Sequence, residues 1–146
     1  MSIPQFNQHG WLPDGIYDCT VEEAGARFGA FQSTDQRPRL WAKFIEFVRE
    51  AKASRLVELV LLDGSFVTAK SEPKDVDAVM LVPADFAEQA KSGMEPAMEL
   101  EEMFAIRQPD ELFMAEDEKD WNAWCDFLAW TREPDGRRKG IVEVKL

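Results

Sequence analysis

The sequence predicts an α+β fold in which a mixed β-sheet is packed with helices. Its 146 residues give one domain room for a sizeable core. Its composition, 45% hydrophobic and 31% charged, is that of an ordinary globular protein. Short runs of β-branched and aliphatic residues are interleaved with helical patterns along the chain, which indicates helices packed on one sheet. We therefore expect a single domain over residues 1–146.

Charge and hydropathy exclude several classes of partner. The formal net charge of −11 argues against binding to long DNA, because such binding depends on the release of counterions by basic residues. The N-terminus shows no secretory pattern, and no run approaches the roughly 20 apolar residues of a membrane span. Cys19 and Cys125 lie far apart and outside any Cys-x-x-Cys spacing. We expect a cytoplasmic protein with reduced cysteines and no membrane partner.

The first half of the chain begins with an arm and continues into helix and strand patterns. Residues 1–20 are rich in Pro, Gly and Asn with spaced apolar anchors, which predicts an irregular arm packed on the domain. Thr20 and Glu23 have the spacing of a capping box, so a short helix to about Phe28 should follow. Apolar residues three and four apart predict an amphipathic helix over 37–54. Buried strands are predicted over 55–64 and 75–82.

The second half continues the same alternation. Residues 83–106 read as one helix or two, divided near Gly93 and Pro96. A short strand over 111–116 and a helix over 118–133 follow, and after a turn at 134–140 the chain ends in a strand over 141–146. Trp11 falls outside the helical patterns that hold the other tryptophans, so it is a candidate for the border of a pocket. The 118–133 helix should bury one side, formed by Trp121, Trp124, Phe127, Leu128 and Trp130.

Two aspartates mark the start of the second predicted strand. Side chains alternate along a strand, so Asp75 and Asp77 should point to one face with their Cα atoms about 6.5–7 Å apart. Two neighbouring carboxylates repel each other unless a cation lies between them. Mg²⁺ suits such a place, because it is usually held by one or two carboxylates plus substrate phosphates. The pair therefore predicts a site for a hard divalent cation.

A Gly-Ser turn closes the strand before these aspartates. Gly64 lets the backbone approach a ligand, and free amides at the turn, with the Ser65 hydroxyl, can accept a phosphate. Thr68 can support the loop by hydrogen bonding. A phosphate cradle and a metal site are thus expected to face each other across one hairpin-like unit.

The order Gly64-Ser65 and then Asp75-Val76-Asp77 resembles the signature of the DNA polymerase beta-like nucleotidyltransferase superfamily. More narrowly, residues 3–20, 63–77 and 134–146 resemble a largely uncharacterised bacterial and phage family of small nucleotidyltransferase-like proteins. This resemblance covers nearly the full length of the chain. It implies a minimal polymerase beta-like nucleotidyltransferase fold.

The resemblance also implies a reaction. An NMP would move from an NTP to a protein or RNA hydroxyl with the help of two Mg²⁺ or Mn²⁺ ions. Asp75 and Asp77 would be catalytic metal ligands, and Gly64, Ser65, Thr68 and Lys70 would bind the nucleotide. A third carboxylate usually comes from a neighbouring strand. Glu111 is the best match, Asp110 the near alternative and Glu143 the distant one.

The biological setting leaves alternatives open. The leading hypothesis is an active enzyme in a toxin–antitoxin or phage-defence module with a cognate partner protein. The competing hypothesis is a catalytically inactive module that keeps the fold and binds a nucleotide or a partner protein. Its motivation is the open identity of the third carboxylate and an acidic segment over 85–120 that could meet a basic partner. An unrelated α+β structural protein would predict that Asp75 and Asp77 diverge in space.

Overall fold

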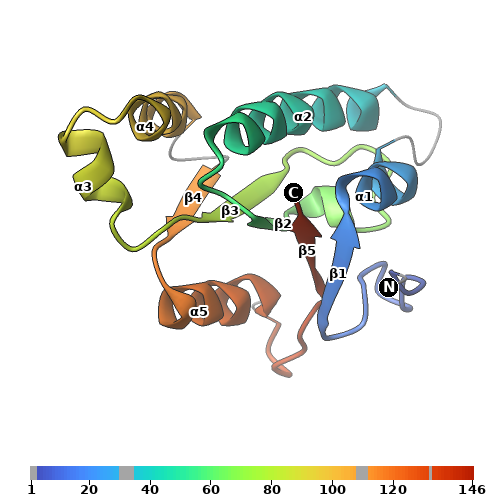
Figure 1. The fold of residues 1–146 in the computed structure, drawn as a ribbon. Coiled ribbons are helices and arrows are strands. Elements are labelled where there is room, and N and C mark those ends of the chain that lie inside the picture. The colour runs from blue at the N-terminus through green and yellow to red at the C-terminus, as the bar shows by residue number, and fades with distance from the viewer. Residues whose placement is uncertain (1–2, 30–34, 108–111, 132) are drawn as a thin grey trace.

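The computed structural model describes residues 3–29, 35–107, 112–131 and 133–146 and has the predicted α+β architecture. The sheet has five strands in the order β1-β5-β2-β3-β4 (Figure 1). Its strands are β1 (Ile16–Thr20), β2 (Leu59–Asp63), β3 (Asp77–Leu81), β4 (Leu112–Ala115) and β5 (Ile141–Lys145). The helices are α1 (Val21–Phe28), α2 (Gln36–Ser54), α3 (Phe86–Lys91), α4 (Glu95–Arg107) and α5 (Glu118–Ala129), with a short 3₁₀ helix η1 (Ser65–Val67).

The sheet is mixed. The outer pairs β1–β5 and β3–β4 are parallel, whereas β2 pairs antiparallel with both β5 and β3. Most predicted elements are confirmed, with strands a few residues shorter than expected and with 83–106 divided into α3 and α4. The Thr20–Glu23 capping box is also confirmed, since each side chain accepts a hydrogen bond from the backbone N–H of the other residue.

Strand β1 corrects the prediction that residues 1–20 are irregular. Residues 3–15 contain no helix or strand, but residues 16–20 pair with β5 from Ile16 opposite Ile141 to Thr20 opposite Lys145. β1 is an edge strand in which Cys19 is buried and Ile16 is 51% exposed. Its sequence therefore lacks the alternation of a half-buried strand, and its pairing partner lies at the other end of the chain.

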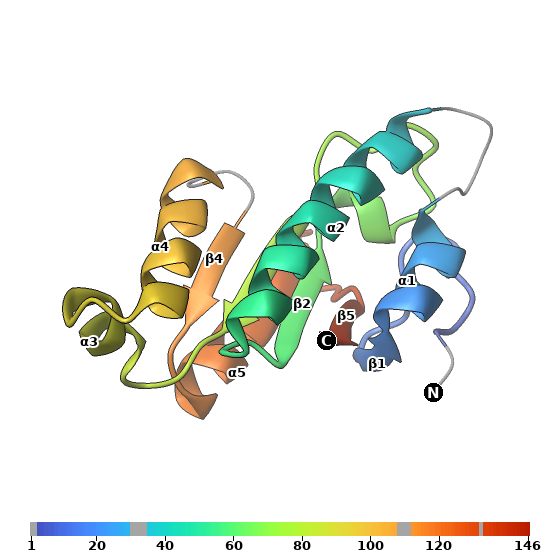
Figure 2. The same cartoon turned by 45° about the horizontal axis from the view of Figure 1, so that its top comes forward.

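Alternate side chains of the sheet enter two separate cores. Val60, Leu62 and Met80 pack with residues of α1, α2 and α4. Leu61 and Val79 point the other way, onto α5. Figures 1 and 2 show the same arrangement, with α2 lying across one face of the sheet and α5 beneath the other. This alternation decides that Asp63 and Asp77 share the α5 face.

The predicted buried side of α5 is partly wrong. Trp121 and Leu128 are buried, but Phe127 is 53% and Trp130 is 52% exposed. Trp130 lies one residue beyond the helix in an extended conformation, so it leaves the helical face. Because α5 touches the sheet along one stripe only, the aromatic residues beside that stripe stay at the surface.

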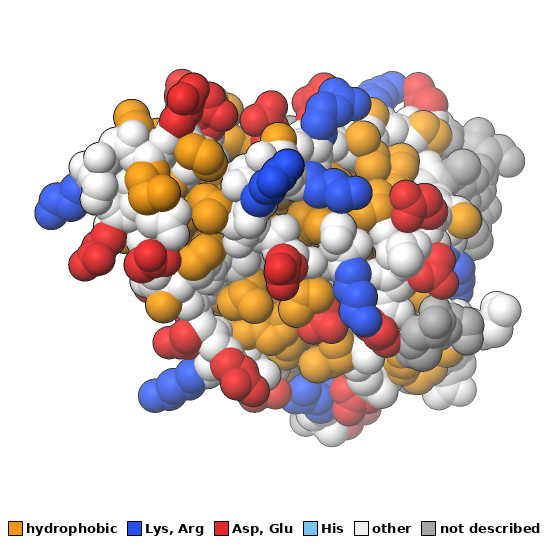
Figure 3. All heavy atoms as spheres, viewed as in Figure 1, with side chains coloured by type: hydrophobic (Ala, Val, Ile, Leu, Met, Phe, Trp, Pro, Cys, Tyr) orange, Lys and Arg blue, Asp and Glu red, His pale blue; other side chains and the backbone are white. Residues whose placement is uncertain are grey.

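The surface carries charges of both signs. Figure 3 shows acidic and basic side chains interspersed around exposed hydrophobic patches on one face of the molecule. Within the described ranges, none of the helices combines the length and the apolar character needed to cross a membrane. Both cysteines are free and buried, Cys19 in the core under α1 and α2 and Cys125 in the core under α5.

Candidate functional site

Three irregular segments meet at one end of the sheet. Strand β2 ends at Asp63, directly opposite Asp77, where β3 begins. Strand β5 begins at the same level, since Val142 pairs with Leu62. The arm over residues 3–15 leads into β1, which begins opposite the start of β5. The loop over 64–76 joins β2 to β3, and the turn over 134–140 leads into β5. The sheet topology therefore places all three segments around one site.

A cavity of about 710 Å³ lies between these segments. Its volume is within the range of about 300–1,000 Å³ that is usual for small-molecule sites. The arm contributes His9, Gly10 and Trp11, and the turn contributes Lys139. The sheet and the loop contribute Asp63, Gly64, Ser65, Thr68, Ala69, Lys70, Lys74, Asp75 and Asp77. Three carboxylates and three lysines thus face a single opening, with Trp11 at its border as expected.

The cavity gathers most of the residues singled out in the sequence. Asp75 and Asp77 do not diverge, and both line it together with Gly64, Ser65, Thr68 and Lys70. Glu111 and its alternative Asp110 lie outside the described residues. Glu143 lies within β5 opposite Leu61 and does not line the cavity.

The placement of Asp75 differs from the prediction. Strand β3 begins at Asp77, so the two aspartates do not alternate on one strand as expected. Asp75 lies in the preceding loop, where its Oδ1 accepts hydrogen bonds from Ser65 N at 3.1 Å and Ser65 Oγ at 2.9 Å. Ser65 therefore holds Asp75 close to η1, and β3 begins two residues later than predicted.

The Gly-Ser turn already binds an anion, and that anion is a side chain of the protein. The Ser65 amide and hydroxyl, expected to accept a phosphate, surround the carboxylate of Asp75 instead. Gly64 has φ 89° and ψ −177°, a conformation essentially restricted to glycine. A Cβ at Gly64 would lie 3.0 Å from Asp75 Oδ1. Thr68 supports the loop as predicted, because its Oγ1 donates to Ser65 O at 2.6 Å.

A buried arginine organises the rest of this loop. Arg37 of α2 is 0% exposed, and its Nη1 donates to Phe28 O at 3.1 Å and Phe66 O at 2.6 Å. Its Nη2 donates to Thr68 O at 2.6 Å and Lys70 O at 2.8 Å. Burial lowers the pKa of the guanidinium to about 10. In the sequence Arg37 is one of several charged residues of an amphipathic helix, so no local pattern distinguishes it.

Asp63 is a third cavity carboxylate that the sequence analysis did not single out. It is 4% exposed, and the Nζ of Lys139 lies 3.0 Å from its Oδ1. Burial raises the pKa of Asp63 from 3.8 to about 6, although the charge of Lys139 acts in the opposite direction. Its position before Gly64 resembles an ordinary Asp-Gly turn, and Lys139 lies 76 residues later along the printed sequence. The ion pair depends on β2 and β5 being neighbours.

The raised pKa of Asp63 predicts a pH dependence of stability. The folded chain holds this proton more tightly than the unfolded chain, so the stabilisation is complete below about pH 4 and is lost as the pH rises through about 6. We expect Asp63→Asn to gain stability relative to the native chain over this interval. Urea unfolding between about pH 4 and pH 7 measures this difference in the free energy of unfolding, with a chelator present to remove divalent cations. Asp126→Asn, on an 81% exposed side chain, is the control, and equal slopes for all three proteins would contradict the prediction.

The cavity contains carboxylate oxygens that could serve as metal ligands. Among the described residues, no group of three His, Cys, Asp or Glu side chains is arranged to hold one. Asp75 and Asp77 nevertheless bring two carboxylates to the same cavity. Oxygen donors of this kind fit Mg²⁺ or Mn²⁺, which keep waters and take substrate phosphates as further ligands.

The fold and the cavity together define an α+β protein with a charged pocket at the end of the central strand β2. The chain belongs to a family of unknown function, DUF6932, whose model matches residues 4–145. No curated protein and no solved structure matches the chain.

Proposed function

We propose that the protein is a metal-dependent nucleotidyltransferase that moves an NMP from an NTP to a hydroxyl of a protein or RNA. One observation carries this proposal: Asp75 and Asp77 share a nucleotide-sized cavity with the Gly64-Ser65 turn and three lysines. Carboxylates for cations beside amines for phosphates are the combination that a metal-bound triphosphate requires. The resemblance to polymerase beta-like nucleotidyltransferases supports the same class.

Two of the three carboxylates and all three lysines of the cavity would take part in this reaction. Asp75 and Asp77 would hold the metal, with Glu111 as the proposed third ligand. The three lysines, Lys70, Lys74 and Lys139, would bind the phosphates. Bound Mg²⁺ or Mn²⁺ would neutralise the triphosphate and lower the pKa of the acceptor hydroxyl.

The bonds change in a single exchange. The acceptor oxygen forms a bond to the α-phosphorus, and the bond from that phosphorus to the bridging oxygen breaks. Pyrophosphate leaves with the electron pair, and the hydroxyl proton passes to solvent. Ser65 contributes by holding the Asp75 carboxylate in place through two hydrogen bonds.

The proposed setting is the cytoplasm, in a toxin–antitoxin or phage-defence module with a cognate partner protein. Two buried free cysteines suit a reducing compartment. The net charge of −11 disfavours long DNA as the acceptor.

The function is tested by label transfer. The pure protein is incubated with Mg²⁺ or Mn²⁺, each α-labelled NTP in turn and a bacterial lysate. We expect a labelled protein or RNA band whose formation falls at least about 100-fold in Asp77→Asn, because a metal ligand is lost. Asp126→Asn removes an exposed carboxylate outside the cavity and should transfer label normally.

Two results would contradict the proposal. Transfer that persists in Asp77→Asn would remove this aspartate from the chemistry. Absence of both transfer and metal-dependent NTP binding would exclude a nucleotide site altogether.

The second candidate is a catalytically inactive module that binds a nucleotide or a partner protein. Two observations favour it: the Gly-Ser donors are occupied by Asp75, and among the described residues no three acidic, His or Cys side chains are arranged to hold a metal ion. Metal-dependent NTP binding without transfer under every condition would support its nucleotide-binding form.

A further inference from the structure

The cavity has a second wall that the carboxylates and lysines do not form. It is made by the arm, whose His9 and Trp11 face the cavity from the side of β1. The two rings have centroids 5.1 Å apart and planes tilted by 35°. The guanidinium of Arg137 lies 5.8 Å from the centre of the Trp11 ring. We call His9 and Trp11 the aromatic wall.

Hydrogen bonds hold the aromatic wall in shape. Asn7 Oδ1 accepts the backbone N–H groups of His9 at 2.9 Å and Trp11 at 3.1 Å. The backbone N–H of Asn7 donates to Trp11 O at 2.7 Å, which closes the turn. The Ala69 amide donates to Gly10 O at 2.8 Å and so ties the arm to the loop that carries the Gly-Ser turn. The aromatic wall and the loop over residues 64–76 therefore form one connected structure.

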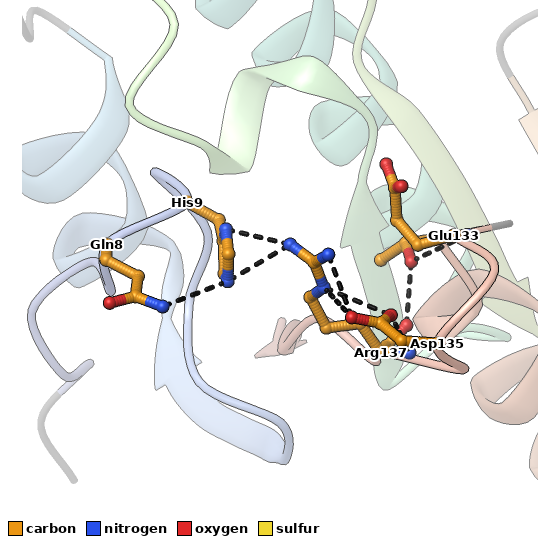
Figure 4. Close-up of polar contacts among 6 residues, drawn as sticks. Gln8, His9, Glu133, Asp135 and Arg137 are labelled. Atoms are coloured by element: carbon orange, nitrogen blue, oxygen red, sulfur yellow. Dashed lines mark hydrogen bonds and ion pairs between the residues drawn. The ribbon is translucent and has the colours of Figure 1, made fainter.

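A contact with the C-terminal turn orients the imidazole. Arg137 Nη1 lies 2.9 Å and 3.1 Å from the two ring nitrogens of His9, so one guanidinium nitrogen contacts both (Figure 4). Asp135 binds the other side of the guanidinium, with its Oδ2 2.8 Å from Arg137 Nε. Figure 4 shows Arg137 between His9 of the arm and Asp135 of the turn. The arm and the turn are thus joined at the mouth of the cavity.

The two halves of the cavity have different chemistry. The half with three carboxylates and three lysines addresses a metal and phosphates, whereas the aromatic wall offers flat π surfaces. A ligand that carries both a polyphosphate and a flat aromatic ring matches both halves. We propose that the aromatic wall receives the nucleobase of the NTP, an inference that rests on the proposed function.

This assignment predicts how the site selects its substrate. Stacking depends on the π face that every base has, so it contributes affinity without strong discrimination among bases. The enzyme should therefore distinguish a nucleotide from a bare polyphosphate more sharply than one NTP from another.

The test compares an NTP with inorganic tripolyphosphate, both measured by calorimetry in excess Mg²⁺. We expect the native protein to bind the NTP at least about tenfold more tightly than tripolyphosphate, the size of one stacking contact. Trp11→Leu should abolish this preference and leave the affinity for tripolyphosphate unchanged. Trp11→Phe should keep most of it. His9→Leu changes an exposed residue and should lower NTP affinity alone by a few-fold.

Trp124→Leu makes the same substitution on α5, away from the cavity, and should leave both affinities unchanged. Equal binding of NTP and tripolyphosphate by the native protein would contradict the assignment of the nucleobase to the aromatic wall, but not the proposed phosphate site. A Trp11→Leu protein that keeps its preference for NTP, or that loses affinity for both ligands equally, would also contradict this assignment. If the native protein binds neither ligand, the proposed function fails, and the wall fails with it.

Discussion

Replacing Arg37 with methionine should lower the free energy of unfolding by about 3–5 kcal/mol, because buried carbonyls lose hydrogen bonds from a charged donor. Methionine fills much of the same volume but donates no hydrogen bonds. The carbonyls of Phe28, Phe66, Thr68 and Lys70 would each lose the donor that they have in the folded protein. Urea unfolding near neutral pH measures the difference.

Arg39→Met is the matched control on the same helix. The Arg39 side chain is 69% exposed and pairs with the 82% exposed Asp35, so its loss should cost less than about 1 kcal/mol. Similar losses for the two variants would show that the four carbonyl contacts of Arg37 contribute little. Hydrogen exchange adds a local test, since amides of the 64–70 loop should lose protection in Arg37→Met and keep it in Arg39→Met.

Gly64→Ala should damage both stability and the site. Its φ of 89° with ψ −177° is a backbone region that costs a non-glycine residue about 1–3 kcal/mol. The added Cβ would lie 3.0 Å from Asp75 Oδ1 and 3.2 Å from the amide nitrogen of Asp77. We expect metal-dependent NTP affinity to fall at least about tenfold, because the Asp75 carboxylate and the backbone that carries Asp77 are both crowded by the new Cβ. Calorimetry of the folded variant measures this loss.

Gly93→Ala separates the effect of the backbone from that of the site. Gly93 has φ 85°, but a Cβ there would meet no atom within 4 Å. This variant should lose some stability and keep its NTP affinity. If Gly64→Ala binds NTP as well as Gly93→Ala does, the contact with Asp75 has no part in binding.

Arg37→Met and Gly64→Ala both act on the loop over residues 64–70, which is held from two directions. Arg37 of α2 fixes its carbonyls, and Asp75 fixes the amide and hydroxyl of Ser65. A loop held in this way presents its charged side chains without reordering when a ligand arrives. The proposed phosphate and metal sites depend on this order, because Gly64, Ser65, Lys70 and Asp75 all belong to the held segment or to its anchor.

Local patterns in the sequence were sufficient for most of the secondary structure. The capping box at Thr20 and Glu23, the apolar spacing over 37–54 and the buried strand that ends at Asp63 each depend on residues within a few positions of one another. The grouping of Gly64, Ser65, Asp75 and Asp77 was predictable for a similar reason. A turn between adjacent antiparallel strands brings its two ends together.

Tertiary structure decided what local patterns do not encode. Strand β1 exists because β5 lies beside it, and the Asp63–Lys139 pair forms where β2 and β5 meet. The sequence by itself determined the helices, the central strands and the grouping of the Gly64-Ser65 turn with Asp75 and Asp77, since short-range spacing specifies these. Only the folded chain brought Arg37 under the loop and the arm against Arg137, because burial and long-range contacts depend on which elements become neighbours.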